Sequence, residues 1–199
     1  MDTTNLYGAG GHAKVIADII CACGGSIEKI YDDDSSIGRF LDRDVLPPSC
    51  IDASHTLIIS IGNNSIRRDI ARALKNAEYA TAIHPSAIIS PSATLAAGSV
   101  VMQGAIVQAD VQIGRHCIIN TGASVDHDCR IADFVHIAPH ATLCGNVEVG
   151  EGTLIGAGTV VIPGVKIGKN CMIGAGSVVV RDIPDNTKGF GNPFRAKNG

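Results

Sequence analysis

A repeat of six residues fills the second half of the chain and constrains its fold more than any other feature. From Ile83 to Pro184 the sequence divides into 17 consecutive hexads without an insertion, and every hexad begins with Ile, Leu or Val. The fifth residue of each hexad is small or β-branched. One large and one small inward-facing residue in every six suit short strands joined by tight turns, with three hexads closing one triangular coil. Residues 83–184 are therefore predicted to form an all-β prism whose coils stack at the spacing of neighbouring strands, about 4.8 Å.

The composition fits such a prism and excludes several classes of protein. Glycine occurs 23 times, aromatic residues make up only 4% and Trp is absent, as a narrow core of small side chains requires. A formal charge of −3 without a basic run argues against nucleic-acid binding, and no apolar stretch is long enough to span a membrane. Seven cysteines without a CxxC pair, and a start without the pattern of a secretory signal, indicate a reduced chain in the cytoplasm.

The sixth residue of each hexad is expected to point outward, and it predicts how the prism meets its surroundings. Two of the three faces carry mostly apolar sixth residues, and the third face is polar. The first face carries Val100, Ile118, His136, Leu154 and Met172. The second face carries Ile88, Ile106, Ser124, Thr142, Val160 and Val178. Because apolar stripes of this size are unfavourable in water, we expect copies of the chain to associate through them.

Residues 1–82 have the pattern of a separate α/β domain. Strands are expected at residues 5–7, 27–31 and 57–61, helices at 12–23 and 66–74, and a connecting loop at 35–55. The alternation of strands and helices predicts a small parallel sheet, similar to half of a Rossmann domain. The predicted organisation is thus an α/β domain at 1–82, the prism at 83–184 and a C-terminal tail at 185–199.

A glycine-rich turn follows the first strand and opens the first helix. Gly8-x-Gly10-x-x-Ala13, with acids about 20 residues later, fits a dinucleotide fingerprint, in which backbone N–H groups and a helix N-terminus bind a pyrophosphate. A nicotinamide cofactor, a plain glycine turn beside a solvated acidic loop, and a nucleotide-linked substrate are the three interpretations. A half-domain has room for a mononucleotide, which favours the substrate. Its phosphates are then expected near Gly10, Gly11 and His12, and its ribose or base near Asp33 and Asp34.

The motifs together resemble a known family. The segment GAGGHAKV at residues 8–15, the acidic end of the second strand, the IGNN segment at 61–64 and the hexads are similar to the bacterial hexapeptide-repeat sugar O/N-acyltransferases. These include UDP-4-amino-sugar N-acetyltransferases and sialic acid O-acetyltransferases, and the resemblance covers essentially the whole chain. It implies a left-handed parallel β-helix, a homotrimer, acetyl-CoA as co-substrate with no permanently bound cofactor, and a nucleotide-linked sugar as acceptor. It also adds Gly62, Asn63 and Asn120 to the expected acceptor site.

His127 is the candidate catalytic base. It lies between Asp126 and Asp128 at the third position of its hexad, an outward turn, with Gly145 one coil above it. A carboxylate beside an imidazole can hold its tautomer and raise its basicity, although an exposed corner histidine with acidic neighbours needs no catalytic role. The resemblance implies that His127-Asp128 is the catalytic His-acid pair of the family. Members commonly have Glu at the second position of this pair, so Asp126 is kept as the alternative orienting group.

A second set of residues is expected to bind acetyl-CoA. Gly145 offers a backbone N–H to the oxyanion at close approach, and Ala157 and Ala175 lie in Gly-Ala-Gly strips that suit an extended pantetheine arm. The resemblance implies that His136, half a coil beyond His127, touches the thioester. Basic residues towards the C-terminus suit the phosphates of CoA. They are Lys166, Lys169, Lys188, Arg195 and Lys197.

Other functions compete with acetyl transfer to an amino sugar. A zinc enzyme on the same helix would need three histidines, and His116, His136 and His140 are the candidate set, with a spacing one residue shorter than in the γ-type carbonic anhydrases. No metal site is predicted from it. A non-catalytic binding module is the second alternative. Among acetyltransferases, the aspartates after the second strand favour a UDP-4-amino-4,6-dideoxy sugar, with O-acetylation of sialic acid or a related polysaccharide sugar as the runner-up.

Overall fold

The computed structural model describes residues 3–52 and 55–197 of the chain. Its N-terminal part is a five-stranded sheet in the order β3-β4-β2-β1-β5, in which β1, β2, β4 and β5 run parallel. The strands are β1 (Thr3–Tyr7), β2 (Ser26–Tyr31), β3 (Arg39–Phe40), β4 (Arg43–Leu46) and β5 (Thr56–Ile59). The helices are α1 (Gly11–Ala22) and α2 (Asn64–Ala73), with a single 3-10 turn at Pro48–Cys50. The predicted α/β fold with a parallel sheet is confirmed.

Residues 35–55, for which the sequence predicts a loop, contain a short hairpin. β3 and β4 pair antiparallel, and the two residues between them, Leu41 and Asp42, have left-handed φ angles of 49° and 59°. Two positive φ values in a row are typical of a type I′ turn, which is usually recognised by Asn-Gly or Gly-Gly. This turn contains neither residue, so the pattern that identifies such hairpins is missing from the sequence.

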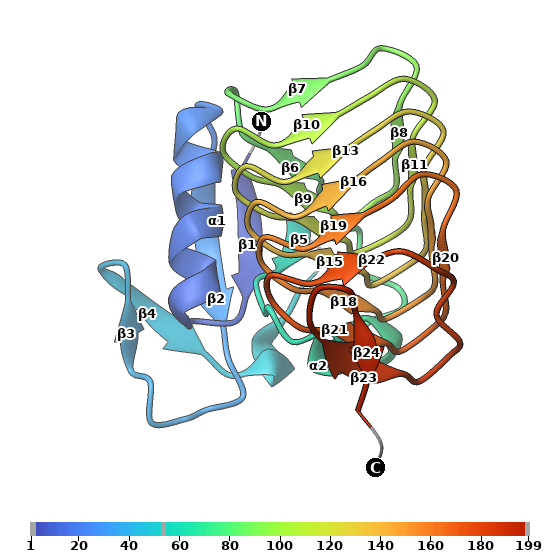
Figure 1. The fold of residues 1–199 in the computed structure, drawn as a ribbon. Coiled ribbons are helices and arrows are strands. Elements are labelled where there is room, and N and C mark those ends of the chain that lie inside the picture. The colour runs from blue at the N-terminus through green and yellow to red at the C-terminus, as the bar shows by residue number, and fades with distance from the viewer. Residues whose placement is uncertain (1–2, 53–54, 198–199) are drawn as a thin grey trace.

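From Ala82 onward the chain forms a three-sided prism of parallel two-residue strands, coloured green to red in Figure 1. Ile106, for example, pairs with Ile88 one coil before it and with Ser124 one coil after it. The first face contains β6 (Ala82–Ile83), β9 (Val100–Val101), β12 (Ile118–Ile119), β15 (His136–Ile137), β18 (Leu154–Ile155) and β21 (Met172–Ile173). The second face contains β7 (Ile88–Ile89), β10 (Ile106–Val107), β13 (Ser124–Val125), β16 (Thr142–Leu143), β19 (Val160–Val161) and β22 (Val178–Val179). The third face contains β8 (Thr94–Leu95), β11 (Gln112–Ile113), β14 (Arg130–Ile131), β17 (Glu148–Val149) and β20 (Lys166–Ile167).

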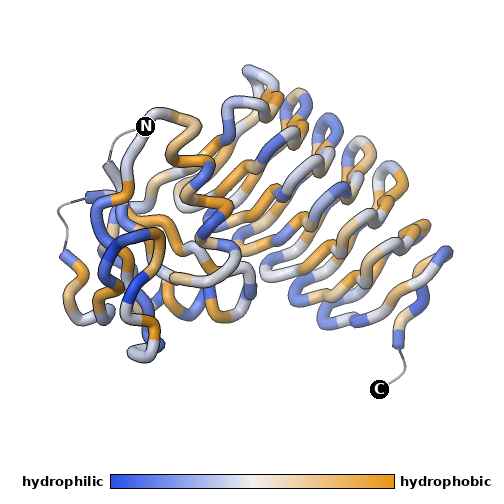
Figure 2. Tube along the Cα trace, turned by 90° about the vertical axis from the view of Figure 1, so that its left-hand side faces the viewer, coloured by the Kyte–Doolittle hydropathy of each residue, from blue (hydrophilic) through white to orange (hydrophobic). Residues whose placement is uncertain are grey.

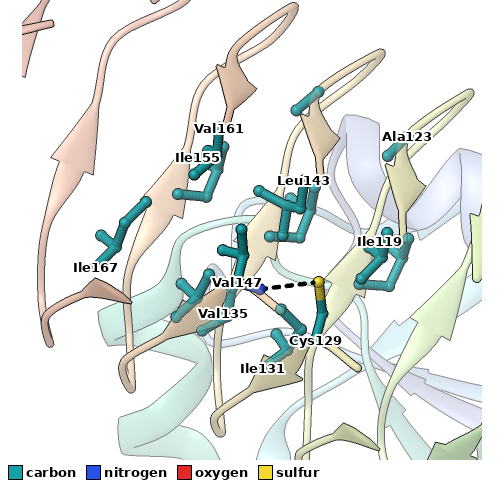
Figure 3. Close-up of a cluster of buried hydrophobic side chains, with 14 of the residues drawn as sticks. Ile119, Ala123, Cys129, Ile131, Val135, Leu143, Val147, Ile155, Val161 and Ile167 are labelled. Carbon is teal, nitrogen blue, oxygen red and sulfur yellow. Dashed lines mark hydrogen bonds between the residues drawn. The ribbon is translucent and has the colours of Figure 1, made fainter. Parts of the chain in front are cut away.

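The hexad explains both the core and the corners of the prism. First and fifth residues such as Ile119, Ala123 and Leu143 point inward and fill the centre (Figure 3). Every fourth residue from Gly98 to Gly176 turns a corner with a left-handed φ between 51° and 79°. Glycine, asparagine and aspartate adopt this conformation at low cost, which accounts for many of the glycines in the chain.

The α/β domain packs on the first face of the prism, with α1 against that face (Figure 1). Ile16 and Ile20 of α1 belong to the same buried cluster as Val100, Met102 and Ile118 of the prism. The apolar sixth residues of this face predict an interface between copies of the chain. The structure corrects that prediction for Val100 and Ile118, which are at most 2% exposed because the N-terminal domain of the same chain covers them.

The second face and the C-terminal end remain uncovered within one chain. Ile88 is 65% exposed and Val160 37% exposed on the second face, so the apolar stripe there stays a predicted contact between copies. The segment predicted as a tail extends the first face, because β23 (Lys188–Phe190) runs parallel to β21 and β24 (Arg195–Ala196) pairs antiparallel with β23.

Hydrophobic and hydrophilic stretches alternate along each coil (Figure 2). Within the described ranges, no helix is both long and apolar enough to cross a membrane.

Candidate active site

His127 lies exposed at the corner between the second and third faces, with Asp128 beside it. Nδ1 of His127 is 2.8 Å from Oδ2 of Asp128. Asp128 is the fourth residue of its hexad and has a φ of 62°, a conformation that aspartate tolerates. Since a carboxylate accepts at Nδ1, a neutral imidazole carries its proton there and leaves the Nε2 lone pair free. The hydrogen bond that His127 donates to Asp128 and the charge of Asp126 raise the pKa of His127.

The structure distinguishes the two carboxylates on either side of His127. Oδ1 of Asp126 accepts a hydrogen bond from the backbone N–H of His127 at 2.8 Å, whereas Asp128 contacts the ring itself. Asp128 is therefore placed to fix the tautomer, and Asp126 is placed to hold the backbone of the turn. The catalytic roles of both residues remain predictions.

Gly145 lies directly above the His127 ring, as the spacing of one coil predicts. A Cβ atom at position 145 would come within 2.6 Å of Cε1 and 2.7 Å of Nε2 of His127, so only glycine fits without displacing the ring. An open depression of about 480 Å³ borders both residues. It is lined by Asp126, His127, Cys144, Gly145, Asn146, Pro163 and Gly164. The free nitrogen of His127 thus has space beside it for a reacting group.

The glycine turn and the end of β2 form one connected structure in the α/β domain. Oδ2 of Asp32 accepts the backbone N–H of Ala9 at 2.7 Å, and the hydroxyl of Tyr7 donates to Oδ2 of Asp33 at 2.9 Å. Oδ1 of Asp34 accepts two hydrogen bonds from Ser36. Gly10 and Gly11 are exposed at the start of α1, and their Cα atoms face open space. Asp32, which the sequence does not single out, is the acid that holds the glycine turn.

His12 and Gly62 meet between the two halves of the chain, next to His136 of the first face. The His12 and His136 rings lie 6.4 Å apart, and the Gly62 backbone is hydrogen-bonded to His136. Nδ2 of Asn120 lies 3.0 Å from Nε2 of His136. Burial, and then the charge of Arg67, lower the pKa values of His12 and His136 to about 4. These two histidines are therefore neutral at pH 7.

Asn63 and Arg67 have structural contacts that the sequence does not reveal. Oδ1 of Asn63 accepts the N–H groups of Ser65 and Ile66 and so caps α2. Arg67 is 1% exposed and lies beside His12 and His136, although in sequence it resembles any charged residue on a helix surface. Whether Asn63 also contacts an acceptor stays a prediction.

The predicted site residues fall into separate groups within one chain. His127 and Gly145 lie at the corner opposite the first face, whereas His12, Gly62, Asn120 and His136 lie on the side of the first face. The glycine turn and the acidic end of β2 belong to the domain that packs there. Ala157 and Ala175 are exposed at a third place, the corner between the first and second faces. A single chain does not bring the predicted base next to the predicted acceptor residues.

The three histidines of the zinc alternative do not converge either. His116 is buried at the corner between the third and first faces, stacked on Phe134 at 5.2 Å, while His140 lies at the corner between the first and second faces. His136 lies on the first face between these corners. In the described part of the chain, no three His, Cys, Asp or Glu side chains are grouped as metal ligands would be.

Comparison with known protein families matches both halves of the chain. A family model described as the PglD N-terminal domain matches residues 5–74, and one described as bacterial transferase hexapeptide (six repeats) matches residues 146–181. UDP-N-acetylbacillosamine N-acetyltransferase from Bacillus subtilis is 42% identical over 112 residues, which are 51% of this chain and 52% of that protein. A protein of Acanthamoeba polyphaga mimivirus is 35% identical over 118 residues, 57% of this chain and 24% of that protein. The chain thus spans about half or less of the curated relatives it matches.

Several solved structures match over nearly their whole length. A mutant perosamine N-acetyltransferase from Caulobacter crescentus, in complex with CoA and GDP-perosamine, is 39% identical with a TM-score of 0.93, over 99% of this chain and 97% of that chain. The acetyltransferase domain of PglB from Neisseria gonorrhoeae, in complex with acetyl coenzyme A, is 37% identical with a TM-score of 0.91, over 98% of both chains. This likeness confirms the left-handed β-helix. The chain belongs to the hexapeptide-repeat sugar O/N-acyltransferases, a family of acetyl-transferring enzymes.

Proposed function

We propose that this protein transfers the acetyl group of acetyl-CoA to the amino group of a nucleotide-linked sugar. The observation that carries the proposal is the His127–Asp128 pair, 2.8 Å apart beneath Gly145 and open to a depression. Among structural relatives that cover nearly the whole chain, one is a complex with CoA and GDP-perosamine and another a complex with acetyl coenzyme A. An imidazole with an unprotonated Nε2, in a chain with these relatives, supports direct acyl transfer.

The chemistry needs one proton acceptor and one hydrogen-bond donor. The acceptor nitrogen attacks the thioester carbonyl carbon, and Nε2 of His127 takes the proton that the nitrogen loses. The backbone N–H of Gly145 is the candidate donor to the oxyanion. When the tetrahedral intermediate collapses, the C–S bond breaks and the proton passes from His127 to the CoA sulfur. Asp128 holds the imidazole in the tautomer that this cycle requires.

The site is proposed to be completed by partner copies in a homotrimer. His127 lies at the corner opposite the domain that carries His12 and Gly62, so no one chain holds base and acceptor residues together. The exposed second face, with Ile88 65% exposed, is the apolar surface available for association. In this arrangement the His127 corner of one copy faces the first-face side of its neighbour. Ala157, Ala175 and His136 then border the path of acetyl-CoA.

The acceptor we favour is a UDP-4-amino-4,6-dideoxy sugar. Asp33, held by Tyr7, and the open glycines Gly10 and Gly11 support a nucleotide diphosphate at the carboxyl ends of β1 and β2. The named relatives include a UDP-linked and a GDP-linked case, and O-acetylation of sialic acid remains the runner-up. No disulfide bond joins any of the seven cysteines, all of which lie within the described residues, and this supports action in the reducing cytoplasm.

An acetyl-transfer screen tests the proposal. Purified protein is given acetyl-CoA with UDP-4-amino sugars, GDP-perosamine, and free or CMP-linked sialic acid, and release of the CoA thiol is followed. We expect turnover with a nucleotide-linked amino sugar and little with sialic acid. Turnover only with hydroxyl acceptors favours the runner-up. Saturable acetyl-CoA binding without turnover on any acceptor contradicts an enzymatic role.

A double variant tests the acceptor half of the site. Asp33→Ala with Asp34→Ala should raise the KM of the nucleotide-linked acceptor by about tenfold or more, since two carboxylates leave the nucleotide site. The KM of acetyl-CoA should stay within about twofold, because these residues lie in the α/β domain rather than on the prism. Equal loss for both substrates would mean that the acidic turn is structural.

A further inference from the structure

Arg67 is a buried cation without a carboxylate partner. It lies in α2, is 1% exposed, and takes part in none of the ion pairs found among the described residues. Burial lowers its pKa to about 10, which still leaves it charged at pH 7. Placing an unpaired charge inside a protein is costly unless every donor is hydrogen-bonded. The position of Arg67 therefore requires an explanation beyond helix packing.

The hydrogen bonds of Arg67 connect two parts of the molecule. One is the corner of the prism between the third and first faces, and the other is the segment 61–64 at the end of β5. From the corner, the carbonyl of His116 accepts from Nε at 2.8 Å and that of Phe134 accepts from Nη2 at 3.2 Å. From the segment, the acceptors are the carbonyls of Ile61 and Gly62, at 2.9 and 3.2 Å from Nη1, and Oδ1 of Asn64, at 2.8 Å from Nη2.

The same segment is bonded to His136 of the prism. Oδ1 of Asn120 accepts the N–H of Thr121, so its Nδ2 is the donor towards Nε2 of His136. An imidazole that accepts at Nε2 is neutral and carries its proton on Nδ1. That N–H is then the donor to the Gly62 backbone, whose carbonyl also accepts from Arg67. One carbonyl thus joins the buried guanidinium to the histidine.

We propose that Arg67 is a positioning residue that fixes the segment 61–64 on the prism and thereby sets the place of the acceptor sugar relative to the acetyl group. This inference rests on the proposed function, because Gly62 matters to the acceptor only if an acceptor binds beside it. All five N–H donors of Arg67 are hydrogen-bonded within the protein, so its role is to position the segment and not to bind a substrate. Its planar guanidinium fork donates hydrogen bonds to carbonyls of both parts at once, which an ammonium group cannot do with the same geometry.

The charge of Arg67 has a second consequence for the neighbouring rings. The charged and titratable groups that face His136 are Arg67 from α2 and His12 from α1, and Asn120 and Gly62 are its polar neighbours. No carboxylate is among the groups that act on His136. Burial, then the charge of Arg67 and to a lesser extent His12, hold the pKa of His136 at about 4. Removing Arg67 should therefore raise the pKa of His136 as well as loosen the segment.

Three variants separate geometry from charge. Arg67→Met removes both the fork and the charge, and Arg67→Lys keeps the charge without the fork. Arg68→Met is the matched control, since Arg68 is on the same helix and bonds to Asn170 and Glu151 of the prism but not to segment 61–64. Each intact protein is measured by steady-state kinetics for both substrates and by ¹⁵N NMR titration of the histidine rings, assigned with His136→Gln.

The expected results differ for each variant. Arg67→Lys should raise the KM of the acceptor at least about tenfold and leave His136 neutral above about pH 5. Arg67→Met should do the same to KM and also move the titration of His136 to higher pH. Arg68→Met should change the acceptor KM less than about twofold, although it too loses a contact between the halves.

Two outcomes overturn the inference. An unchanged acceptor KM in folded Arg67→Lys shows that the segment does not depend on the fork, and this variant decides the matter if Arg67→Met does not fold. Equal effects of Arg67→Lys and Arg68→Met show a general loss of domain packing. If the wild-type chain acetylates no nucleotide-linked sugar, the proposed function fails. The NMR titration still tests the bond between segment 61–64 and His136 in that case.

Discussion

His127 is exposed at a corner beside two carboxylates, whereas His12 and His136 are half-buried between the α/β domain and the prism beside the guanidinium of Arg67. The pKa of His127 is raised by the hydrogen bond to Asp128, while burial and a nearby positive charge hold the other two near 4. The same fold thus raises the pKa of one histidine and lowers the pKa of two others.

The difference follows from where each ring sits on the hexad. A third-position residue such as His127 projects from a corner into solvent, and a fourth-position aspartate beside it turns its carboxylate towards the ring. A sixth-position residue such as His136 points out from a face, and this face is covered by the N-terminal domain. The exposed corner at His127 suits a group that gains and loses a proton, whereas burial lowers the pKa of His116, at a covered corner, to about 4. The covered face suits neutral rings with fixed hydrogen bonds.

Replacing His127 should have the largest effect on activity. We expect His127→Ala to lower kcat by at least about 10²-fold, the scale of a lost general base. Binding of acetyl-CoA, measured by calorimetry, should be nearly unchanged. His84→Ala is the control, because His84 is bonded to Ser86 in the first hexad, away from the depression. Full activity of His127→Ala would reject it as the base.

The two neighbouring aspartates should differ in their effect on the pH profile. Asp128→Asn should lower kcat by roughly tenfold or more and move the acid limb of kcat/KM to lower pH. The sign follows because Asp128 raises the pKa of His127, and a general base works only when deprotonated. Asp126→Asn should move the limb less, since its carboxylate bonds to the backbone. A larger shift with Asp126→Asn would exchange the two roles.

Gly145→Ala should disturb the His127 ring without straining the backbone. The new Cβ would lie 2.6 Å from the ring, so we expect roughly 1–2 kcal/mol of destabilisation and a lower kcat. The double variant with His127→Ala is the control, because the clash disappears with the ring. Denaturation should show that Gly145→Ala costs little in that background. An equal cost in both backgrounds would place its origin elsewhere in the coil.

The hexad repeat made the prism and the His127 corner predictable from the sequence. The contacts between the α/β domain and the prism were not predictable in this way. A period of six identifies the prism, the corner at His127 and the glycine above it, because register alone places residues one coil apart. Nothing in the sequence says that Val100 and Ile118 meet α1 rather than another copy of the chain. Arg67 carries no local signal, since its carbonyl partners at 116 and 134 belong to main chain far away in sequence.

The dependence of stability on pH should show the same contrast on a smaller scale. His12, His116 and His136 have folded-state pKa values of about 4, below the ordinary value of 6.5. Between these limits the unfolded chain binds more protons, so the free energy of unfolding should fall as pH drops from 6.5 to 4. Each of these histidines contributes at most roughly 1.4 kcal/mol per pH unit. Stability linked to His127, with its raised pKa, should instead be lost as pH rises through that pKa.

Urea denaturation at several pH values across this window measures the effect. His136→Gln keeps an acceptor for Asn120 and a donor for Gly62 but cannot titrate, so it should flatten the slope. His127→Gln should not flatten it, because the exposed ring titrates with the opposite sign. If both variants flattened the slope equally, the covered face would not be protecting its histidines from protons. The difference between the pKa values of His127 and His136 would then come only from the neighbouring aspartates and from Arg67.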